Sequence, residues 1–393
     1  MNDAIVIVGA SRTPMGSFQG DFSALAANDL GAAAIKAAVE RAGIAPDVVD
    51  EVLFGNCLMA GQGQAPARQA ALKAGLPISA GAVTLSKMCG SGMRAAMFGH
   101  DMLLAGSADV IVAGGMESMT NAPYLLPKAR GGYRIGHDRI FDHMMLDGLE
   151  DAYEPGRSMG TFGEDCAAKY SFTREQQDQF ATTSVTRAQA ATSSGAFAAE
   201  ITPVTVKGRA GDKVISIDEG PGRIKLDKIT SLKPAFKKDG TITAASSSSI
   251  NDGAAAMVMM RESTAAKLGC KPLARLVAHA VHAQEPNWFA TAPVGSVRKV
   301  LAKAGWAVSG VDLWEVNEAF AVVPMALMHD LGLSHDIVNV NGGACALGHP
   351  IGASGARIMV TLLYALQARG LKKGIATLCI GGGEATAVAL EML

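Results

Sequence analysis

Short runs of apolar residues alternate along the chain with longer segments in which apolar and small residues recur at helical spacing. The apolar runs predict strands at Ile5–Val8, Glu51–Phe54, Val110–Ala113, Ala274–His279, Leu313–Val316, Ile337–Val340 and Ala376–Ile380. The helical spacing predicts helices at Leu30–Ala42, Met93–Leu104, Arg174–Ser194, Val297–Ala304, Phe320–Leu331 and Ala356–Ala368. This alternation is typical of an α/β fold.

Residues from about 120 to 243 interrupt this alternation. They are more charged and richer in glycine than the flanking segments, and tyrosine and proline occur there at irregular spacing. We expect this stretch to be a loop or lid insertion into the first half of the protein, with the helix 174–194 inside it.

The chain contains an internal repeat. Residues 35–54, in which Ala-Gly is followed by an aspartate and an apolar strand, recur 262 residues later as residues 297–316. Ser91-Gly92-Met93-Arg94 recurs 263 residues later as Ser354-Gly355-Ala356-Arg357. Two matches in the same order favour a duplication. We therefore expect two similar halves, residues 1–270 and 271–393, whose equivalent helix N-termini face one shared site.

Composition and charge disfavour several classes of function. The 393 residues carry 35 basic and 36 acidic side chains, so a nucleic-acid partner is disfavoured. Neither a run of about 18 apolar residues nor a targeting segment is present, so no membrane span is expected. The six scattered cysteines predict reduced thiols in a cytoplasmic protein. His279 and His282 lack the carboxylate of a zinc-protease motif and are interpreted as ordinary, so no metal is expected.

Cys89 has the local sequence of a nucleophile. It lies in Lys87-Met88-Cys89-Gly90-Ser91-Gly92, immediately before a predicted helix of small residues. The N–H groups and partial positive charge of a helix N-terminus stabilise a thiolate, and the glycines permit close approach of a ligand. A buried structural cysteine is the alternative interpretation.

Three further residues stand at positions suited to chemistry. His349 lies in the glycine-rich loop 341–352, a setting that suits a general base for a thiol. Cys379 lies near the end of an apolar strand that runs into three glycines, where it either carries a proton or fills the core. Asn317 follows a strand end and either holds a water or an oxyanion, or caps the next helix.

Taken together, these segments resemble the thiolase family over essentially the whole chain. The resemblance is carried by Cys89-Gly90-Ser91-Gly92, Asn317-Glu318-Ala319-Phe320, the His349-Pro350 loop, and Cys379 before three glycines. It implies an α/β fold of two similar βαβ-type halves in five layers, α-β-α-β-α, with an inserted loop domain. Residues 130–136 look like the loop through which short-chain biosynthetic thiolases form tetramers, which implies a homo-oligomer, a dimer of dimers.

The resemblance implies an acetyl-CoA C-acetyltransferase, which reversibly condenses two acetyl-CoA into acetoacetyl-CoA and CoA. In that reaction His349 deprotonates Cys89, Cys89 takes the acyl group, and Cys379 removes a proton from C2 of the second acetyl-CoA. His349 with a water held by Asn317 forms one oxyanion site, and the N–H groups of Cys89 and Gly381 form the other. No cofactor is implied, because acyl-CoA and CoA are substrates and products.

The resemblance also implies a coenzyme A tunnel. Ser248 is expected near the pantetheine, and the tunnel lining is expected to be Leu149, Met159, Phe236, Ala244, Ala319 and Phe320. The sequence departs from the pattern of the short-chain biosynthetic thiolases at Ser158, Pro221, Ser249 and Glu384. Arg223 and Lys225 are candidate substitutes for an arginine that the pattern places near Pro221, on the CoA nucleotide.

Three other functions stay open from the sequence. A broad-range 3-ketoacyl-CoA thiolase (acetyl-CoA C-acyltransferase) is favoured by Ser158, whereas the tetramer-type loop and the compact insertion favour the acetyltransferase. A decarboxylating ketoacyl synthase shares the fold but usually has two histidines, and Cys379 occupies the second position here. A non-catalytic acyl-CoA-binding protein predicts the loss of a catalytic residue, and none is lost.

Overall fold

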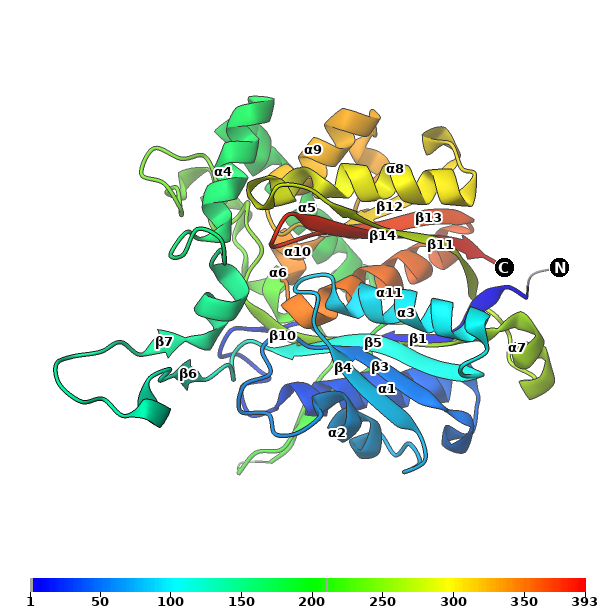
Figure 1. Ribbon diagram of the computed structural model, residues 1–393. Helices are drawn as coiled ribbons and strands as arrows, with labels where there is room; N and C mark the ends of the chain where they lie inside the picture. Colours follow the sequence, from blue (N-terminus) through cyan, green and yellow to red (C-terminus); the bar gives the residue numbers. More distant parts are fainter. Residues whose placement is uncertain (1–2, 210) are drawn as a thin grey trace.

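One large sheet in two halves forms the centre of the protein. The computed structural model describes residues 3–209 and 211–393, and its main sheet has ten strands in the order β12-β13-β14-β11-β1-β10-β5-β3-β4, with β2 beside β10. The strands are β1 (Ile5–Arg12), β2 (Gly16–Ser17), β3 (Glu51–Gly55), β4 (Gly81–Leu85), β5 (Val110–Ser118), β10 (Asn251–Arg261), β11 (Ala274–Ala283), β12 (Leu313–Val316), β13 (Lys373–Ile380) and β14 (Glu384–Met392). The halves meet where β1 and β11 share two residue pairs, and they lie one above the other in Figure 1.

Helices cover both faces of each half and complete five layers (Figure 1). The outer layers are α1 (Ala27–Ala42) with α2 (Pro66–Lys73), and α8 (Ala292–Ala304) with α9 (Val322–Leu331). The middle layer is α3 (Ser91–Ala105) with α11 (Ile351–Arg369). The α/β fold in five layers that the resemblance implies is therefore confirmed.

The chain between β5 and β10 leaves the layers; much of it packs along one side of them, and one hairpin projects away (Figure 1). It contains the hairpin of β6 (Tyr124–Leu125) and β7 (Phe141–Asp142), α4 (Met159–Tyr170), α5 (Arg174–Ser194), the hairpin of β8 (Val204–Val206) and β9 (Lys213–Ile215), and α6 (Glu219–Arg223). Helix α5 has the predicted bounds, because Thr173 and Gln176 form a capping box at its N-terminus. Two short helices, α7 (Glu262–Leu268) and α10 (Ala344–Leu347), lie outside this segment.

The predicted strand at Ile337–Val340 is wrong. A single 3₁₀ turn spans His335–Ile337, and Val338 forms one isolated bridge with Trp314. Asn339 has a φ of 49°, and its side-chain amide pairs with the backbone N–H and C=O of Val316 at 2.8 Å each. These side-chain hydrogen bonds take the place of the backbone hydrogen bonds that a strand at this position would form. The pattern also leaves out β4, β10 and β14, which the structure contains.

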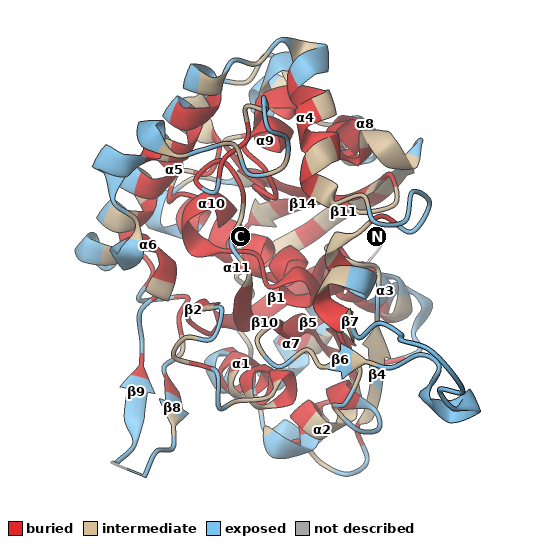
Figure 2. Ribbon diagram, turned by 90° about the vertical axis from the view of Figure 1, so that its left-hand side faces the viewer, coloured by how far each residue is buried: buried red, intermediate tan, exposed pale blue. Residues whose placement is uncertain are grey.

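Helix α11 is buried on all sides over most of its length, as the central red helix in Figure 2 shows. By length and composition it is apolar enough to cross a membrane, but 83% of its most apolar window is buried inside the protein. A helix that is apolar around its whole circumference is typical of a protein core.

The two central helices cross at glycines that are equivalent in the internal repeat. A Cβ on Gly92 of α3 would lie 2.8 Å from the backbone nitrogen of Ala356, and a Cβ on Gly355 of α11 would lie 2.5 Å from the backbone nitrogen of Met93. Glycine is therefore required for the two backbones to come this close. Since Gly92 is the second residue of α3 and Gly355 the fifth residue of α11, the crossing places the N-termini of the two helices side by side.

We expect Gly355→Ala to destabilise the protein, because the added methyl group overlaps the backbone of Met93. Overpacking of this kind costs about 1–3 kcal/mol. Chemical denaturation measures the change, with Gly310→Ala as the control, because a Cβ on Gly310 meets no atom within 4 Å. Equal stability of Gly355→Ala and the unmodified protein would contradict the close contact.

Candidate active site

A cavity at the N-termini of α3 and α11 brings most of the predicted site residues together. Its inner part, of about 60 Å³, is lined by the predicted residues Cys89, Leu149, Met159, Ser248, Ala319, Phe320, His349, Cys379 and Gly381. Its outer part, of about 270 Å³, shares several of these and adds Phe236 and Ser158. The segments that supply these side chains lie far apart in the sequence and come from both halves of the protein.

Two predicted residues do not line this cavity. Asn317 lies behind His349, with its Nδ2 3.4 Å from Nδ1 and 3.5 Å from Nε2 of the imidazole. Ala244 lines a neighbouring cavity of about 290 Å³, together with Arg223, Lys225 and Lys228. Ser249 lines both this neighbouring cavity and the outer part of the first one, so the two adjoin there. The three cations therefore line a cavity that adjoins the outer part of the cavity containing Cys89.

Cys89 is held by a strained turn between β4 and α3. Met88 has a φ of 46°, in the left-handed region that residues other than glycine rarely adopt. The Ser91 hydroxyl donates to the Met88 carbonyl at 2.6 Å and accepts from the Lys87 N–H at 2.8 Å, which closes the turn. Strain of this kind persists where the surrounding contacts fix the backbone, and it is found at functional sites.

The thiol of Cys89 is neutral at neutral pH. Burial raises the pKa of Cys89 to about 11, and the nearby Glu117 contributes to the increase. The N–H of Gly381, which faces the thiol, lowers the pKa but does not compensate for burial. Backbone N–H groups at the helix start therefore favour the thiolate, as expected, but desolvation of the anion outweighs them in the free protein.

His349 is a neutral base with its lone pair on Nε2. Its Nδ1 lies 2.5 Å from the Ser354 hydroxyl, which donates its own proton to the Pro350 carbonyl at 2.9 Å. Ser354 therefore accepts from Nδ1–H, which leaves Nε2 free to accept a proton. Burial, with a smaller contribution from Arg357, lowers the pKa of His349 to about 3. The imidazole is uncharged over the whole neutral range.

Cys379 and Asn317 complete the arrangement from the second half of the sheet. Burial raises the pKa of Cys379, on β13, well above its usual value, and the nearby Cys89 raises it further. Asn317 is fully buried, and its Oδ1 has no hydrogen-bond partner among the described residues. A buried acceptor of this kind is suited to hold a water molecule.

Two positioning residues were not singled out from the sequence. Ser354 fixes the imidazole of His349, and its equivalent in the internal repeat, Ser91, fixes the Cys89 turn. The internal repeat, which aligns Ser354 with Ser91, could therefore have identified Ser354 from the sequence. Glu117 accepts the N–H groups of Cys57, Leu58 and Gly352, and burial raises its pKa to about 7. An acidic residue within the apolar strand β5 was the signal for Glu117.

The four departures from the short-chain pattern have different surroundings. Ser158 lines the outer part of the cavity. Ser249 donates to Asn251 Oδ1 at 2.7 Å, and the carbonyl of Pro221 accepts from Gln189. Glu384 forms an ion pair with Lys87, so it joins the strand that follows Cys379 to the turn that holds Cys89.

Known proteins match the chain over its whole length. Residues 5–263 match the thiolase N-terminal domain, and residues 270–392 match the thiolase C-terminal domain. The acetyl-CoA acetyltransferases of Rhizobium meliloti and Allochromatium vinosum are 50% and 49% identical to this chain, over 100% of both proteins in each case. The crystal structure of the Bacillus anthracis acetyl-CoA acetyltransferase is similar with a TM-score of 0.97 and 41% identity, and the match covers 100% of both chains.

We expect the rate at which iodoacetamide alkylates Cys89 to rise about tenfold per pH unit from about pH 7 to pH 9, because the thiolate is the reactive form. A thiol with a pKa of about 11 gains thiolate throughout this range. Timed labelling with peptide mapping measures the rate, and Cys89→Ser identifies the background. A rate that stays level between pH 7 and pH 9 would instead indicate a thiolate paired with an imidazolium in the free protein.

Proposed function

The chain belongs to the thiolase family, and we propose that it is an acetyl-CoA C-acetyltransferase, which condenses two acetyl-CoA into acetoacetyl-CoA and CoA and catalyses the reverse. The observation that carries this proposal is the single cavity that contains Cys89, His349 and Cys379. A nucleophile, a neutral base and a second thiol face one space there.

In the first step the acetyl group moves from CoA to Cys89. The thiol attacks the thioester carbonyl, and His349 Nε2 accepts its proton in the transition state, because both groups are neutral beforehand. The carbonyl oxygen becomes negatively charged and accepts the N–H groups of Cys89 and Gly381. A donor of this type contributes about 10²–10³ in rate.

The proton balance assigns Cys379 two roles. The imidazolium keeps the proton of Cys89, so that Nε2–H can later donate to the second substrate. The proton for the departing CoA thiolate therefore comes from Cys379. The resulting Cys379 thiolate then removes a proton from C2 of the second acetyl-CoA. Its raised pKa suits this task, because a thiolate that is poorly solvated is a stronger base.

The carbon–carbon bond then forms at Cys89. The enolate oxygen of the second acetyl-CoA accepts Nε2–H of His349 and a hydrogen of a water, whose other hydrogen donates to Asn317 Oδ1. The orphaned, buried Oδ1 supports this water. Carbon C2 attacks the acetyl group on Cys89, the Cys89 thiolate leaves, and His349 returns its proton. Every group ends in its starting state, so the cycle closes and also runs backwards.

The cavities suit a CoA thioester with a short acyl group. The outer, mainly apolar part accepts the pantetheine, and Arg223, Lys225 and Lys228 lie beyond it on the side of the nucleotide phosphates. The inner part measures about 60 Å³, which favours acetyl over longer chains. A broad-range 3-ketoacyl-CoA thiolase is the second candidate, and Ser158 in the outer lining favours it. No resident cofactor is proposed, because these side chains and backbone groups, with one water, supply every proton and donor in the cycle.

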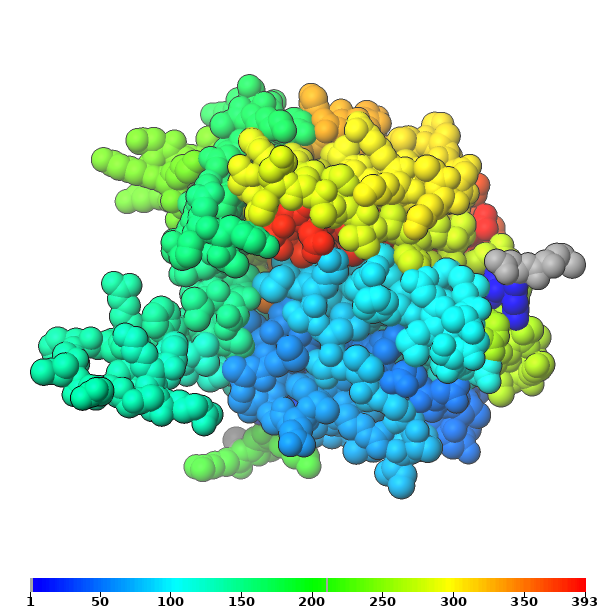
Figure 3. Space-filling model, in the orientation of Figure 1, coloured from blue at the N-terminus to red at the C-terminus, as the bar shows by residue number. Residues whose placement is uncertain are grey.

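We also propose that the enzyme is a cytoplasmic homotetramer, a dimer of dimers. The arm that carries β6 and β7 projects from the body (Figure 3). It exposes the apolar side chains of Tyr124, Leu126, Tyr133, Ile135 and Ile140. At the end of the sheet, β4 exposes Val83. Exposed apolar groups on an arm and on an edge strand are suited to contacts between copies of the chain. The free cysteines favour a reducing compartment.

Acyl transfer to Cys89 tests the proposed function. We expect brief incubation with acetyl-CoA to add one acetyl group, on Cys89, and butyryl-CoA to label it far less. Intact mass and peptide mapping measure the labelling, and Cys89→Ala is the control. Comparable labelling by both donors would support the broad-range thiolase. Absence of an adduct with either donor would contradict the acyltransferase function.

Cys379→Ser tests the division of labour between the two thiols. We expect the rate of condensation to fall by a factor of about 10²–10⁴, because the base that removes the C2 proton of the second acetyl-CoA is lost. Acylation of Cys89 should persist, since the CoA thiolate is a moderate leaving group that solvent can protonate. Acetoacetyl-CoA formation and intact mass measure the two steps separately. Loss of both steps in a folded variant would show that acylation of Cys89 also requires Cys379.

A further inference from the structure

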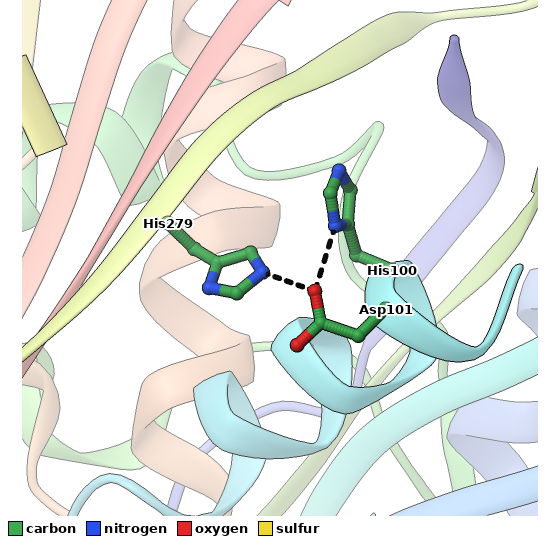
Figure 4. A group of neighbouring side chains, drawn as sticks. All are labelled: His100, Asp101 and His279. Atoms are coloured by element: carbon green, nitrogen blue, oxygen red, sulfur yellow. Dashed lines mark hydrogen bonds and ion pairs between the residues drawn. The ribbon is translucent and has the colours of Figure 1, made fainter. Parts of the chain in front are cut away.

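Two histidines and an aspartate form a cluster at the far end of α3 from Cys89 (Figure 4). His100 and Asp101 lie near the C-terminal end of α3, about 15 Å along the helix axis from its first turn. His279 comes from β11, 178 residues later in the chain than Asp101. Within residues 3–209 and 211–393, this is the one group of three side chains that offers metal-ligating atoms within 4.8 Å of one another.

The distances within the cluster approach those of a metal coordination shell. Asp101 Oδ1 lies 2.9 Å from His279 Nε2 and 3.3 Å from His100 Nδ1. Ligand atoms that surround a tetrahedral zinc ion at bonds of about 2.0–2.1 Å lie roughly 3.3 Å apart. The two imidazole planes are nearly perpendicular, at 86°, with their centroids 5.0 Å apart. A small movement of the exposed Asp101 side chain is therefore sufficient to place one cation among the three atoms.

The protonation states also suit a cation. Burial lowers the pKa values of His100 and His279, which keeps both imidazoles neutral, and a neutral imidazole is the form that binds metal. Burial acts to raise the pKa of Asp101, but the hydrogen bonds from the two histidines outweigh it, so the carboxylate is charged. Lys303, whose Nζ donates to the His279 carbonyl at 3.0 Å, opposes a cation. Imidazole and carboxylate ligands favour zinc, cobalt, nickel and copper over magnesium.

We propose that His100, Asp101 and His279 bind one divalent cation of the zinc class. Each imidazole binds through the nitrogen that faces Asp101 and moves its proton to the other ring nitrogen, so no net proton is released. The cation would join α3, from the first half of the protein, to β11, from the second half. Because the three ligands come together only in the folded chain, binding stabilises the folded state.

Cobalt(II) added to the purified protein tests this site, because its visible spectrum reports the ligand type. We expect one Co²⁺ per chain, with d–d bands of a nitrogen and oxygen site and without the thiolate charge-transfer band that binding at Cys89 or Cys379 produces. Zn²⁺ should displace it and raise the melting temperature, whereas Mg²⁺ should do neither.

Variants separate this cluster from other histidines. We expect His279→Ala and Asp101→Asn each to weaken binding at least tenfold, while His329→Ala binds normally. His329 is a matched control, since its Nδ1 lies 3.0 Å from Asp330 but it belongs to no group of three ligands in the described part of the chain. Equal binding by His279→Ala, or a spectrum with thiolate bands alone, would overturn the proposal.

Discussion

The close crossing of α3 and α11 is the contact on which the site depends. Gly92 and Gly355 allow the two backbones to touch, and the first turns of both helices therefore open onto the same cavity. Cys89 precedes one helix, and His349 precedes the other. A wider separation of the helix N-termini would move the imidazole and the thiol apart. Glu117 strengthens the arrangement, because it accepts N–H groups from the loop after β3 and from Gly352 at the start of α11.

Burial sets the resting charge of this site more strongly than the helix N-termini do. The pKa of Cys89 is about 11 and that of His349 is about 3, so thiol and imidazole rest as a neutral pair. In the proposed mechanism, the N–H groups of Cys89 and Gly381 are then available where negative charge develops. Donors that are already oriented in a poorly solvated cavity stabilise a transition state without reorganisation. The same burial that disfavours the free thiolate thus favours the proposed acyl transfer.

The sequence predicted the parts of the structure that depend on local pattern or on the repeat. Helix α5 and strand β12 have their predicted bounds, and Cys89, His349 and Cys379 share one cavity. The predictions failed where distant groups decide the outcome. Asn339 forms side-chain hydrogen bonds with Val316 where a strand was predicted, and burial outweighs the N–H groups that lower the pKa of Cys89. The spacing of His279 gave no indication of Asp101, because these residues meet only through the packing of β11 on α3.

The two halves use equivalent residues for different purposes. Ser91 and Ser354 occupy the same position of the repeat, yet one hydroxyl closes the turn that holds the nucleophile and the other orients the base. The first half alone carries the long segment between β5 and β10, which supplies Leu149, Met159 and Phe236 to the cavity. The second half supplies both proposed proton carriers, His349 and Cys379. The repeated sequence therefore places two equivalent helices side by side, and in the proposed mechanism the differences between the halves separate nucleophile and substrate walls from acid–base chemistry.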